Sequence, residues 1–325
     1  MTGAIEVRGL LKRYRRATAN AVDGISFDVA DGQLFCLLGP NGAGKTTTVS
    51  ILTTTLRPTG GEVKIAGKSL ATEPRILRRQ MGIVFQQPSL DLNLTAEENI
   101  RLHAVLYGLY PWRPLYRLMP AAYRHRVGEL AEVLGVGQAL RRPARTLSGG
   151  TRRKLEIVRA LLHRPPVLFL DEPTTGLDPE SRRNLWDHLR QARAESGTTL
   201  FLTTHYLEEA EAADAVCVLS QGRIIEAGTP AELKARHLRP ALVLGAAPAD
   251  LPGLRMELAR LGLSPAPAPA HDVRDGDGRL RVLIGDLAPQ AVLRSLQTSL
   301  TYLRVDDPTL EDAYLELLAR PAQSA

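Results

Sequence analysis

One eight-residue segment constrains the fold of this chain more than any other. The run Gly39-Pro-Asn-Gly-Ala-Gly-Lys-Thr46 matches the pattern G-x-x-x-x-G-K-[S/T]. It follows an all-apolar run, Leu34–Leu38, and precedes a stretch of helical character, Thr47–Leu52. In the order strand, loop, helix, such glycines turn backbone N–H groups around a phosphate chain, and the helix N-terminus adds partial positive charge. Lys45 is placed to neutralise phosphate oxygens, and Thr46 to ligate Mg²⁺. The segment therefore predicts a nucleotide-binding α/β fold.

The apolar runs predict the architecture around this loop. Through about residue 235, short strand-like runs alternate with amphipathic helical stretches. Runs that are apolar throughout are typical of parallel strands buried on both faces. Residues 96–164 differ, because they are rich in Leu, Ala and Arg and have helical periodicity. We expect a mostly parallel sheet core in residues 1–235, with a helical subdomain inserted at about 96–164. The predicted strands include Ile5–Leu10, Ile25–Val29, Leu34–Leu38, Val167–Leu170 and Thr199–Thr203.

A second, smaller domain is predicted beyond a shift in composition near Arg239–Pro240. A chain of 325 residues is longer than one hydrophobic core usually organises. Residues 236–325 alternate again, and we expect a small α/β domain there. It would serve either as a brace between two copies or as a passive stabilising appendage. The predicted strands are 241–244, 280–284 and 300–305, the predicted helices are 254–261, 289–296 and 309–319, and a stiff connecting loop holds Pro265, Pro267 and Pro269.

Two adjacent acids end the apolar run Val167–Leu170. Because side chains alternate along a strand, Asp171 and Glu172 are expected to serve different tasks. We assign Asp171 to Mg²⁺ and Glu172 to the water that attacks the γ-phosphate. His205 follows the second apolar run. It is placed to donate to the γ-phosphate opposite the catalytic acid, since a histidine supplies such a donor near pH 7.

A third motif lies about twenty residues before the acid pair, at Leu147-Ser-Gly-Gly-Thr-Arg-Arg-Lys154. Ser148 is a typical helix N-cap residue. Gly149 and Gly150 leave the backbone N–H groups of the first helical turn uncovered. The motif therefore predicts a second anion site, distinct from the phosphate loop.

The phosphate loop, the third motif and the acid pair, in this order, resemble the ATP-binding-cassette (ABC) ATPases. The resemblance covers about residues 4–230 and implies the phosphate-loop NTPase fold of an ABC cassette. Tyr14 resembles the aromatic residue that stacks on adenine. Gln86 resembles the glutamine that joins Mg²⁺ to the membrane-facing subdomain, and Gly176–Asp178 the dimer-contact loop. Thr151 stands where the family often has a glutamine in its signature. This difference changes a side chain and leaves the anion-binding N–H groups unchanged.

The resemblance implies ATP and Mg²⁺ as cofactors. In this family two cassettes close head to tail, so the single cassette of this chain implies a homodimer with two ATP sites. The catalytic residues would be Glu172 and His205, and the Mg²⁺ ligands Thr46, Gln86 and Asp171. The nucleotide would be bound by Tyr14, Gly39, Pro40, Asn41, Gly42, Ala43, Gly44, Lys45, Thr46 and Thr47, and by the signature residues Ser148, Gly149 and Gly150.

Three further segments are similar to the drug-exporter ATPases of the daunorubicin-resistance type: Gln86–Asp91, Leu94–Asn99 and Asp307–Leu315. This similarity implies an ATP-hydrolysing subunit that powers efflux of a drug, antibiotic or similar compound. The route would be a separate multi-span membrane permease. The chain would lie peripherally on the cytoplasmic face of the cell membrane.

Charge is unevenly distributed along the chain. The net charge is +6, and residues 101–164 hold 13 Lys/Arg against 3 Asp/Glu, which is +10 and leaves −4 for the rest. The basic excess indicates a localised electronegative neighbour. It surrounds an aromatic segment, Tyr107–Pro120, whose Trp112 and Tyr116 either contact the membrane partner and anionic headgroups or belong to a solvated loop.

Other readings predict different partners. A soluble ABC protein acting on ribosomes or nucleic acid would use the basic, Tyr-bearing stretch for binding. The single cassette and the lack of long coiled coils disfavour it, and no nucleic acid is expected. An importer ATPase would keep the chemistry and reverse the direction.

No run approaches 18 apolar residues, and Met1–Leu10 lacks a signal core. Cys36 and Cys217 predict buried thiols in a reducing compartment.

Overall fold

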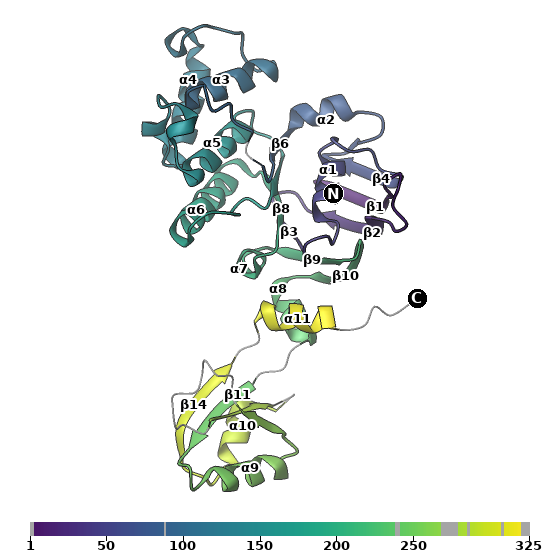
Figure 1. Ribbon diagram of the computed structural model, residues 1–325, viewed down its shortest axis with the longest axis vertical. Helices are drawn as coiled ribbons and strands as arrows, with labels where there is room; N and C mark the ends of the chain where they lie inside the picture. The colour runs from purple at the N-terminus through teal and green to yellow at the C-terminus, as the bar shows by residue number, and fades with distance from the viewer. Residues whose placement is uncertain are drawn as a thin grey trace. The chain divides into compact units, whose positions relative to one another are not determined.

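The computed structural model describes residues 3–87, 89–237, 241–267, 279–284, 287–306 and 309–319. The chain divides into two compact units, Met1–Thr229 and Pro230–Ala325 (Figure 1). The division lies between Thr229 and Pro230. The sequence predicted it six residues later, between residues 235 and 236. The compositional shift at Arg239–Pro240 lies outside the described residues.

The larger unit contains a six-stranded sheet in which the all-apolar strands are central. Its neighbouring strands pair in parallel except at the β10 edge, where β10 and β9 are antiparallel. Every residue of β3 and β8 is buried, the three threonines of β8 included, as expected for central strands of a sheet covered on both faces. The mostly parallel α/β core is confirmed. The strand order is β10 (Arg223–Gly228), β9 (Ala215–Ser220), β3 (Leu34–Leu38), β8 (Thr199–Thr204), β7 (Val167–Asp171) and β6 (Met81–Val84).

A second, antiparallel sheet belongs to the same unit. The predicted strands near residues 5–10 and 25–29 pair with each other here and not in the parallel sheet. The two sheets share one core, in which Phe27 of the second sheet stacks on Phe35 of the first at 5.2 Å between ring centres. The order of this sheet is β2 (Val22–Val29), β1 (Ile5–Lys12), β4 (Gly60–Ile65) and β5 (Lys68–Ser69).

Helices gather in a lobe of the larger unit between β6 and β7 in the chain (Figure 1). A complete capping box, Thr95 with Glu98, begins the first of them. The aromatic segment is held against this lobe, because Arg101 donates to the carbonyl of Arg113 at 2.7 Å, while Trp112 stays 62% exposed. The lobe consists of α3 (Ala96–Leu106), η1 (Tyr116–Leu118), α4 (Ala121–Val133), η2 (Gly137–Ala139), η3 (Ala144–Thr146) and α5 (Gly149–Leu161).

Four further helices complete the larger unit. They are α1 (Lys45–Leu52), α2 (Pro74–Gln80), α6 (Pro179–Ser196) and α7 (Leu207–Glu211). Across the described part of the chain, no helix combines the length and the apolarity that a membrane crossing needs.

The smaller unit is built on an antiparallel sheet. Its order is β12 (Pro265–Pro267), β13 (Arg279–Leu283), β11 (Ala241–Ala246) and β14 (Leu300–Asp306). Leu residues of β11 pack against α9 (Leu251–Arg260) and α10 (Pro289–Arg294), whereas α8 (Pro230–His237) packs against α11 (Leu310–Ala319).

The proline segment of this unit is not simply a connecting loop. Pro265 pairs with Val282 and Pro267 with Leu280, so the segment forms an edge strand. Prolines fit an edge because the N–H groups that they lack are not needed on the outer side. Pro269, Asp307 and Pro308 lie outside the described residues.

Candidate nucleotide site

The phosphate loop leads from the end of β3 into the first turn of α1. Gly39 and Gly44 of this loop leave no room for a side chain. A Cβ at Gly39 would lie 2.3 Å from the carbonyl oxygen of Leu219, and one at Gly44 would lie 2.4 Å from that of Ala21. Gly44 is the N-cap of α1 with φ +106, and no side chain caps the helix. The first N–H groups of α1 therefore have no side-chain acceptor, which suits an anion.

Lys45 lies inside this loop, with 4% of its surface exposed. Its ammonium donates to the carbonyl oxygens of Gly39 at 2.7 Å and Pro40 at 3.1 Å. It also lies 3.9 Å from Glu172 Oε1. Burial lowers the pKa of Lys45, and the carboxylates of Glu172 and Asp171 oppose that shift. The loop thus holds a buried positive charge next to the acid pair.

The two acids stand in different surroundings, as the strand alternation predicted. Asp171 ends β7 and accepts a hydrogen bond from the Thr203 hydroxyl of β8. Burial raises the pKa of Asp171, and the hydrogen bond from Thr203 opposes the shift. Glu172 has φ +45, a conformation that costs a non-glycine residue about 1–3 kcal/mol. Such strain is typical of a functional position.

Side chains from three other segments meet at the Glu172 carboxylate. Gln86, just after β6, donates through Nε2 to Oε2 at 2.9 Å. The Thr175 hydroxyl donates to the same oxygen at 3.2 Å, and His205 Nδ1, just after β8, lies 3.5 Å from Oε1. Ends of parallel strands share one edge of a sheet, and this brings residues 86, 172 and 205 together. Among the described hydrogen bonds, the one to the Glu172 carboxylate from this segment comes from Gln86 and not from its neighbour Gln87.

Tyr14 and Thr46 lie at the rim of this group. The Tyr14 ring is 45% exposed, its hydroxyl lies 3.3 Å from Thr47 Oγ1, and Lys12 Nζ lies 5.6 Å from the ring centre. An exposed aromatic face beside the phosphate loop is suited to a flat base. Thr46 in the first turn of α1 is exposed.

The signature residues form a separate place in the fold. Ser148 is the N-cap of α5 and accepts from the Thr151 N–H at 3.2 Å. Gly149 has open space beside it, and Gly150 lies against Ser181. Among the described hydrogen bonds, none joins Ser148–Gly150 to the phosphate loop of the same chain. The chain therefore brings together its phosphate loop, acids, Gln86 and His205, but not its signature.

Two buried charges near the site were missed by the sequence analysis, Arg153 and Glu156 of α5. They are one turn apart and ion-paired at 3.1 Å. The sequence could have indicated their burial. Both charged residues lie on the same helical face as Ile157 and Ala160, where the 3.6-residue periodicity of an amphipathic helix predicts apolar residues.

At this site the lysine of a phosphate loop faces a strained glutamate, and a glutamine and a histidine contact the same carboxylate. This arrangement defines a phosphate-loop nucleoside triphosphatase. Comparison with known proteins narrows this class. Residues 22–175 match the family model described as ABC transporter. The daunorubicin/doxorubicin resistance ATP-binding protein DrrA of Streptomyces peucetius is 40% identical, over 99% of this chain and 94% of its own length. The Nod factor export ATP-binding protein I of Ralstonia nicotianae is 42% identical, over 80% of this chain and 77% of its own.

Solved structures agree with these relatives. An ATP-binding subunit of an ABC transporter superposes with a TM-score of 0.62 at 32% identity, covering 72% of this chain and 92% of that one. A dimeric, post-hydrolysis cassette, MJ0796 with ADP and phosphate, gives 0.62 at 26% identity, covering 69% and 98%. The chain belongs to the ATP-binding proteins of ABC transporters, in the group of the daunorubicin-resistance type, and it is an ATPase.

Proposed function

We propose that this chain is the ATP-hydrolysing subunit of an ABC exporter. It would power efflux of a drug, antibiotic or similar compound through a separate multi-span membrane permease. The names of its relatives, which refer to daunorubicin or doxorubicin resistance and to Nod factor export, support the direction of transport. The observation that carries the proposal is the meeting of Lys45, Gln86 and His205 around the Glu172 carboxylate at the phosphate loop.

In this proposal each side chain has one task in hydrolysis. Glu172 orients and deprotonates the water that attacks the γ-phosphate, with Gln86 and Thr175 holding its second oxygen. His205 donates to the γ-phosphate from the opposite side of the carboxylate. Lys45 moves from its carbonyl acceptors to the phosphate oxygens, which it neutralises as a point charge.

The remaining residues bind the nucleotide without taking part in proton transfer. The backbone N–H groups of residues 39–47 surround the phosphates, and the dipole of α1 favours their negative charge. Tyr14 stacks on the adenine through its exposed ring face.

Mg²⁺ is the proposed metal cofactor, with Thr46, Gln86 and Asp171 as its ligands. The three side chains offer a hydroxyl, an amide and a carboxylate oxygen, which are the hard donors that Mg²⁺ uses beside phosphates. The contacts fit this role. Thr203 fixes one oxygen of Asp171, and Gln86 uses its NH₂ group on Glu172, which leaves the amide oxygen available. When bound, the metal supplies charge neutralisation at the β- and γ-phosphates.

We further propose that two copies form a head-to-tail homodimer. The signature helix makes no described hydrogen bond to its own phosphate loop, although its N-terminus suits a phosphate. A second copy supplies that phosphate. The dimeric cassette among the similar structures supports this arrangement. Each ATP would then lie between the phosphate loop of one copy and the signature of the other.

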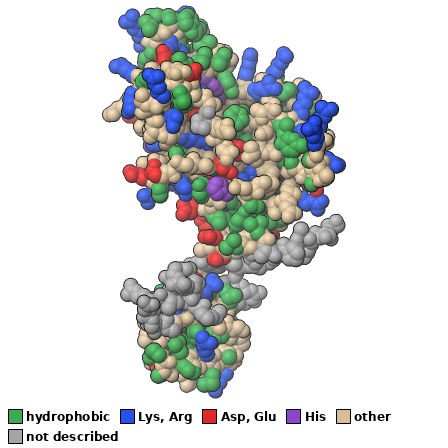
Figure 2. Space-filling model, in the orientation of Figure 1, with side chains coloured by type: hydrophobic (Ala, Val, Ile, Leu, Met, Phe, Trp, Pro, Cys, Tyr) green, Lys and Arg blue, Asp and Glu red, His purple; other side chains and the backbone are tan. Residues whose placement is uncertain are grey.

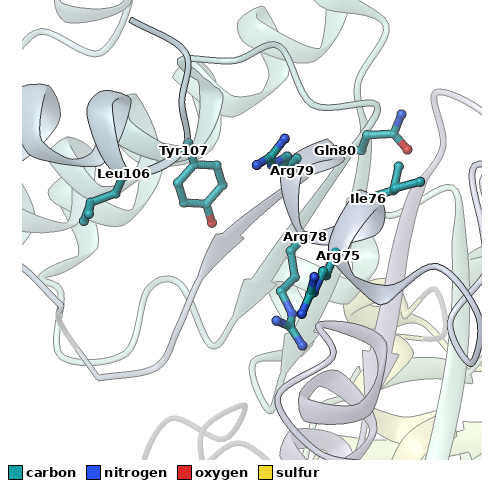
Figure 3. A pocket seen from close by; sticks show the side chains of 7 residues that line it. All are labelled: Arg75, Ile76, Arg78, Arg79, Gln80, Leu106 and Tyr107. Carbon is teal, nitrogen blue, oxygen red and sulfur yellow. The ribbon is translucent and has the colours of Figure 1, made fainter. Parts of the chain in front are cut away.

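The permease would dock in an arginine-lined groove of the larger unit, which places the chain on the cytoplasmic face of the membrane. The groove has a volume of about 690 Å³ between α2 and the end of α3. Figure 3 shows Leu106 and Tyr107 on one side of the groove and the side chains of α2 on the other, with Arg79 pointing toward Tyr107. Ile76 is 45% and Leu106 75% exposed. Figure 2 shows Lys and Arg side chains above this part of the unit. Its lining is Arg75, Ile76, Arg78, Arg79, Gln80, Leu106 and Tyr107.

Charge complementarity defines the expected occupant of this groove. Three guanidinium groups beside exposed aliphatic side chains suit an amphipathic segment that carries carboxylates. We therefore expect an acidic cytoplasmic segment of the permease. Reversing the charge at Arg75 and Arg79 to Glu should remove the permease and leave ATP binding intact. Arg255→Glu, at an exposed position on α9, is the matched control.

The decisive experiment uses Glu172→Gln. This variant should bind ATP and lose about 10²–10⁴-fold in hydrolysis, the usual contribution of a general base. Tagged Glu172→Gln chain, with ATP and Mg²⁺, is then recovered from detergent-solubilised native membranes. Stoichiometric co-elution of a multi-span membrane protein, lost in the Arg75/Arg79 reversal, supports the exporter proposal.

Two outcomes would contradict it. Undiminished hydrolysis by Glu172→Gln would remove the role assigned to that carboxylate. Recovery of ribosomes or nucleic acid alone would keep the ATPase and overturn the transport function, in favour of binding by the basic stretch 101–164.

A further inference from the structure

Helix α5 buries a charge pair that the ATPase chemistry described above does not use. Arg153 is 7% and Glu156 1% exposed, and their Nη1 and Oε2 atoms lie 3.1 Å apart. A buried ion pair is poor evidence for stability, because desolvation cancels much of the attraction. The other hydrogen bonds of Arg153 and Glu156 therefore explain this pair better than the attraction between the two charges.

All five N–H donors of the Arg153 guanidinium have acceptors. Nε donates to the carbonyl of Pro173 at 2.8 Å, and Nη2 to those of Asp171 at 3.0 Å and Glu172 at 3.3 Å. Nη1 donates to Glu156 and to the carbonyl of Phe85. One side chain of the signature helix thus binds three consecutive carbonyls of the acid segment and the carbonyl that precedes Gln86.

The same helix holds the other end of the Gln86 loop. Glu156 Oε1 accepts from the Ser89 N–H at 2.6 Å and from its hydroxyl at 3.2 Å. Arg159 donates to the Ser89 carbonyl at 3.1 Å and to its hydroxyl. Phe85 and Ser89 are therefore both fixed to α5, one by Arg153 and the other by Glu156 and Arg159.

These contacts converge on the hydrogen bond between Gln86 and Glu172. Arg153 binds the backbone on both sides of that bond, at Phe85 and at Glu172. The Glu172 N–H is held in turn by the Thr203 carbonyl at 3.1 Å. The positive φ of Glu172 persists only where its surroundings over-determine it. Arg153 shares this role with Thr203 at the Glu172 N–H and with the Thr175 N–H, which also donates to the Glu172 carbonyl.

We propose that Arg153 is a positioning residue of the ATPase, which makes the placement of Glu172 and Gln86 depend on the placement of the signature helix. Movement of α5 on dimer closure would then be transmitted within the chain to the catalytic carboxylate. The inference rests on the proposed roles of Glu172 and Gln86. Lysine cannot substitute, because an ammonium has three donors and no planar fork, and so cannot span four carbonyls and a carboxylate.

Arg153→Lys is the direct test. Because misplacement by about 1 Å can cost 10²-fold, kcat should fall by about tenfold or more. ATP binding and KM should stay within about threefold, since the phosphate loop is untouched. The matched control is Arg126→Lys on α4, an arginine that also binds an α5 carbonyl, at Leu161, but at the end remote from the acids. Its kcat should equal that of wild type.

A double variant separates positioning from stability. Arg153→Met with Glu156→Leu replaces the pair by apolar side chains of similar volume, which often keeps or raises stability. The proposal expects the low kcat of Arg153→Lys whatever the Tm of the double variant, because the carbonyls of Phe85, Glu172 and their neighbours lose their donor. Recovery of kcat along with Tm would overturn it, as would a kcat of Arg153→Lys equal to that of the Arg126→Lys control. If the double variant does not fold, the comparison of the two lysine variants decides.

Failure of the inference and failure of the proposed function are distinguishable. If Glu172→Gln hydrolyses ATP normally, the catalytic assignment itself falls. If Glu172→Gln is inactive and Arg153→Lys is fully active, only the positioning role of Arg153 falls.

Discussion

The N-termini of α1 and α5 are both suited to an anion, and they differ in what surrounds them. At α1 the N-cap is Gly44, with Lys45 buried beside it and Glu172 3.9 Å from the lysine ammonium. At α5 the N-cap is the exposed Ser148, followed by Gly149 with open space beside it. Both offer backbone N–H groups. Only α1 has a cation and an acid in its own chain.

In the proposed head-to-tail dimer, this difference would make each helix supply a different half of a composite site. A phosphate bound at α1 meets charge, a candidate base and candidate metal ligands. A phosphate bound at α5 would meet backbone N–H groups and the Ser148 hydroxyl, and the proposed base and metal ligands would come from the partner copy. The two N-termini are complementary halves, which is what a head-to-tail pair of identical chains requires.

Complementation between two inactive variants is the largest expected effect. Lys45→Ala damages the α1 half and Ser148→Arg the α5 half. Each variant alone should hydrolyse almost no ATP, because both sites of its homodimer contain one damaged half. An equimolar mixture should regain about a quarter of wild-type activity, since half of the dimers are mixed and each has one intact site.

Hydrolysis by the mixture, measured after dissociation and reassembly, checks this. Mixtures of either variant with itself are the controls. A mixture as inactive as its components would mean that both halves act within one chain.

The two N-termini should also respond oppositely to a methyl group. Gly44→Ala places a Cβ 2.4 Å from the Ala21 carbonyl at φ +106. The cost should be about 1–3 kcal/mol in the free energy of unfolding, together with weaker ATP binding. Urea unfolding and a fluorescent ATP analogue measure the two losses. Gly42→Ala, at φ +81 with no neighbour within 4 Å, should cost less. Equal losses would show that the close approach to Ala21 does not matter.

Acid should destabilise the helical lobe that contains α3 and α5. His103 of α3 stacks on Tyr107 at 4.0 Å, and its Nε2 is buried with no partner among the described residues. Burial, and then Arg159 and His163, lower the pKa of His103 to about 3. The folded state thus disfavours the protonated ring. Stability is full above the usual value of 6.5 and falls as the pH drops from there towards 3.

His103→Phe should remove part of this loss, about 1–2 kcal/mol at pH 5. Unfolding free energies at pH 7 and pH 5 check the prediction. His125→Phe is the control for the substitution itself, because the His125 side chain is 78% exposed. A wild-type slope in His103→Phe would place the acid-sensitive group elsewhere.

The sequence predicted the two helix N-termini far better than it predicted which distant residues meet around Glu172. Residues 39–46, Ser148–Gly150 and the acid pair are local patterns, in which the backbone demands glycine or a strand must end. The meeting of residues 86, 172 and 205 depends on the order of β6, β7 and β8, which no local pattern specifies. The separate pairing of β1 with β2 was missed for the same reason.

Arg153 shows a different limit. Its neighbours in the sequence suggest a solvated basic stretch, because Arg152 and Lys154 flank it. Burial follows from four carbonyl acceptors more than fifteen residues away, together with the carboxylate of Glu156. Pro265 was placed in a loop because proline disfavours strands in general, and only the edge position makes it acceptable.

The smallest expected change in stability concerns the second N-terminus. Gly149 has ordinary helical space around it, so Gly149→Ala should raise the free energy of unfolding by up to about 1 kcal/mol. The same methyl group stands where the phosphate of the partner's ATP would approach the N–H groups, so hydrolysis should fall. Gly137→Ala, also with open space, is the control for hydrolysis. At α1 a methyl group should lower stability and binding together, whereas at α5 stability and activity should move in opposite directions. Unchanged hydrolysis in Gly149→Ala would mean that the N-terminus of α5 does not face a nucleotide.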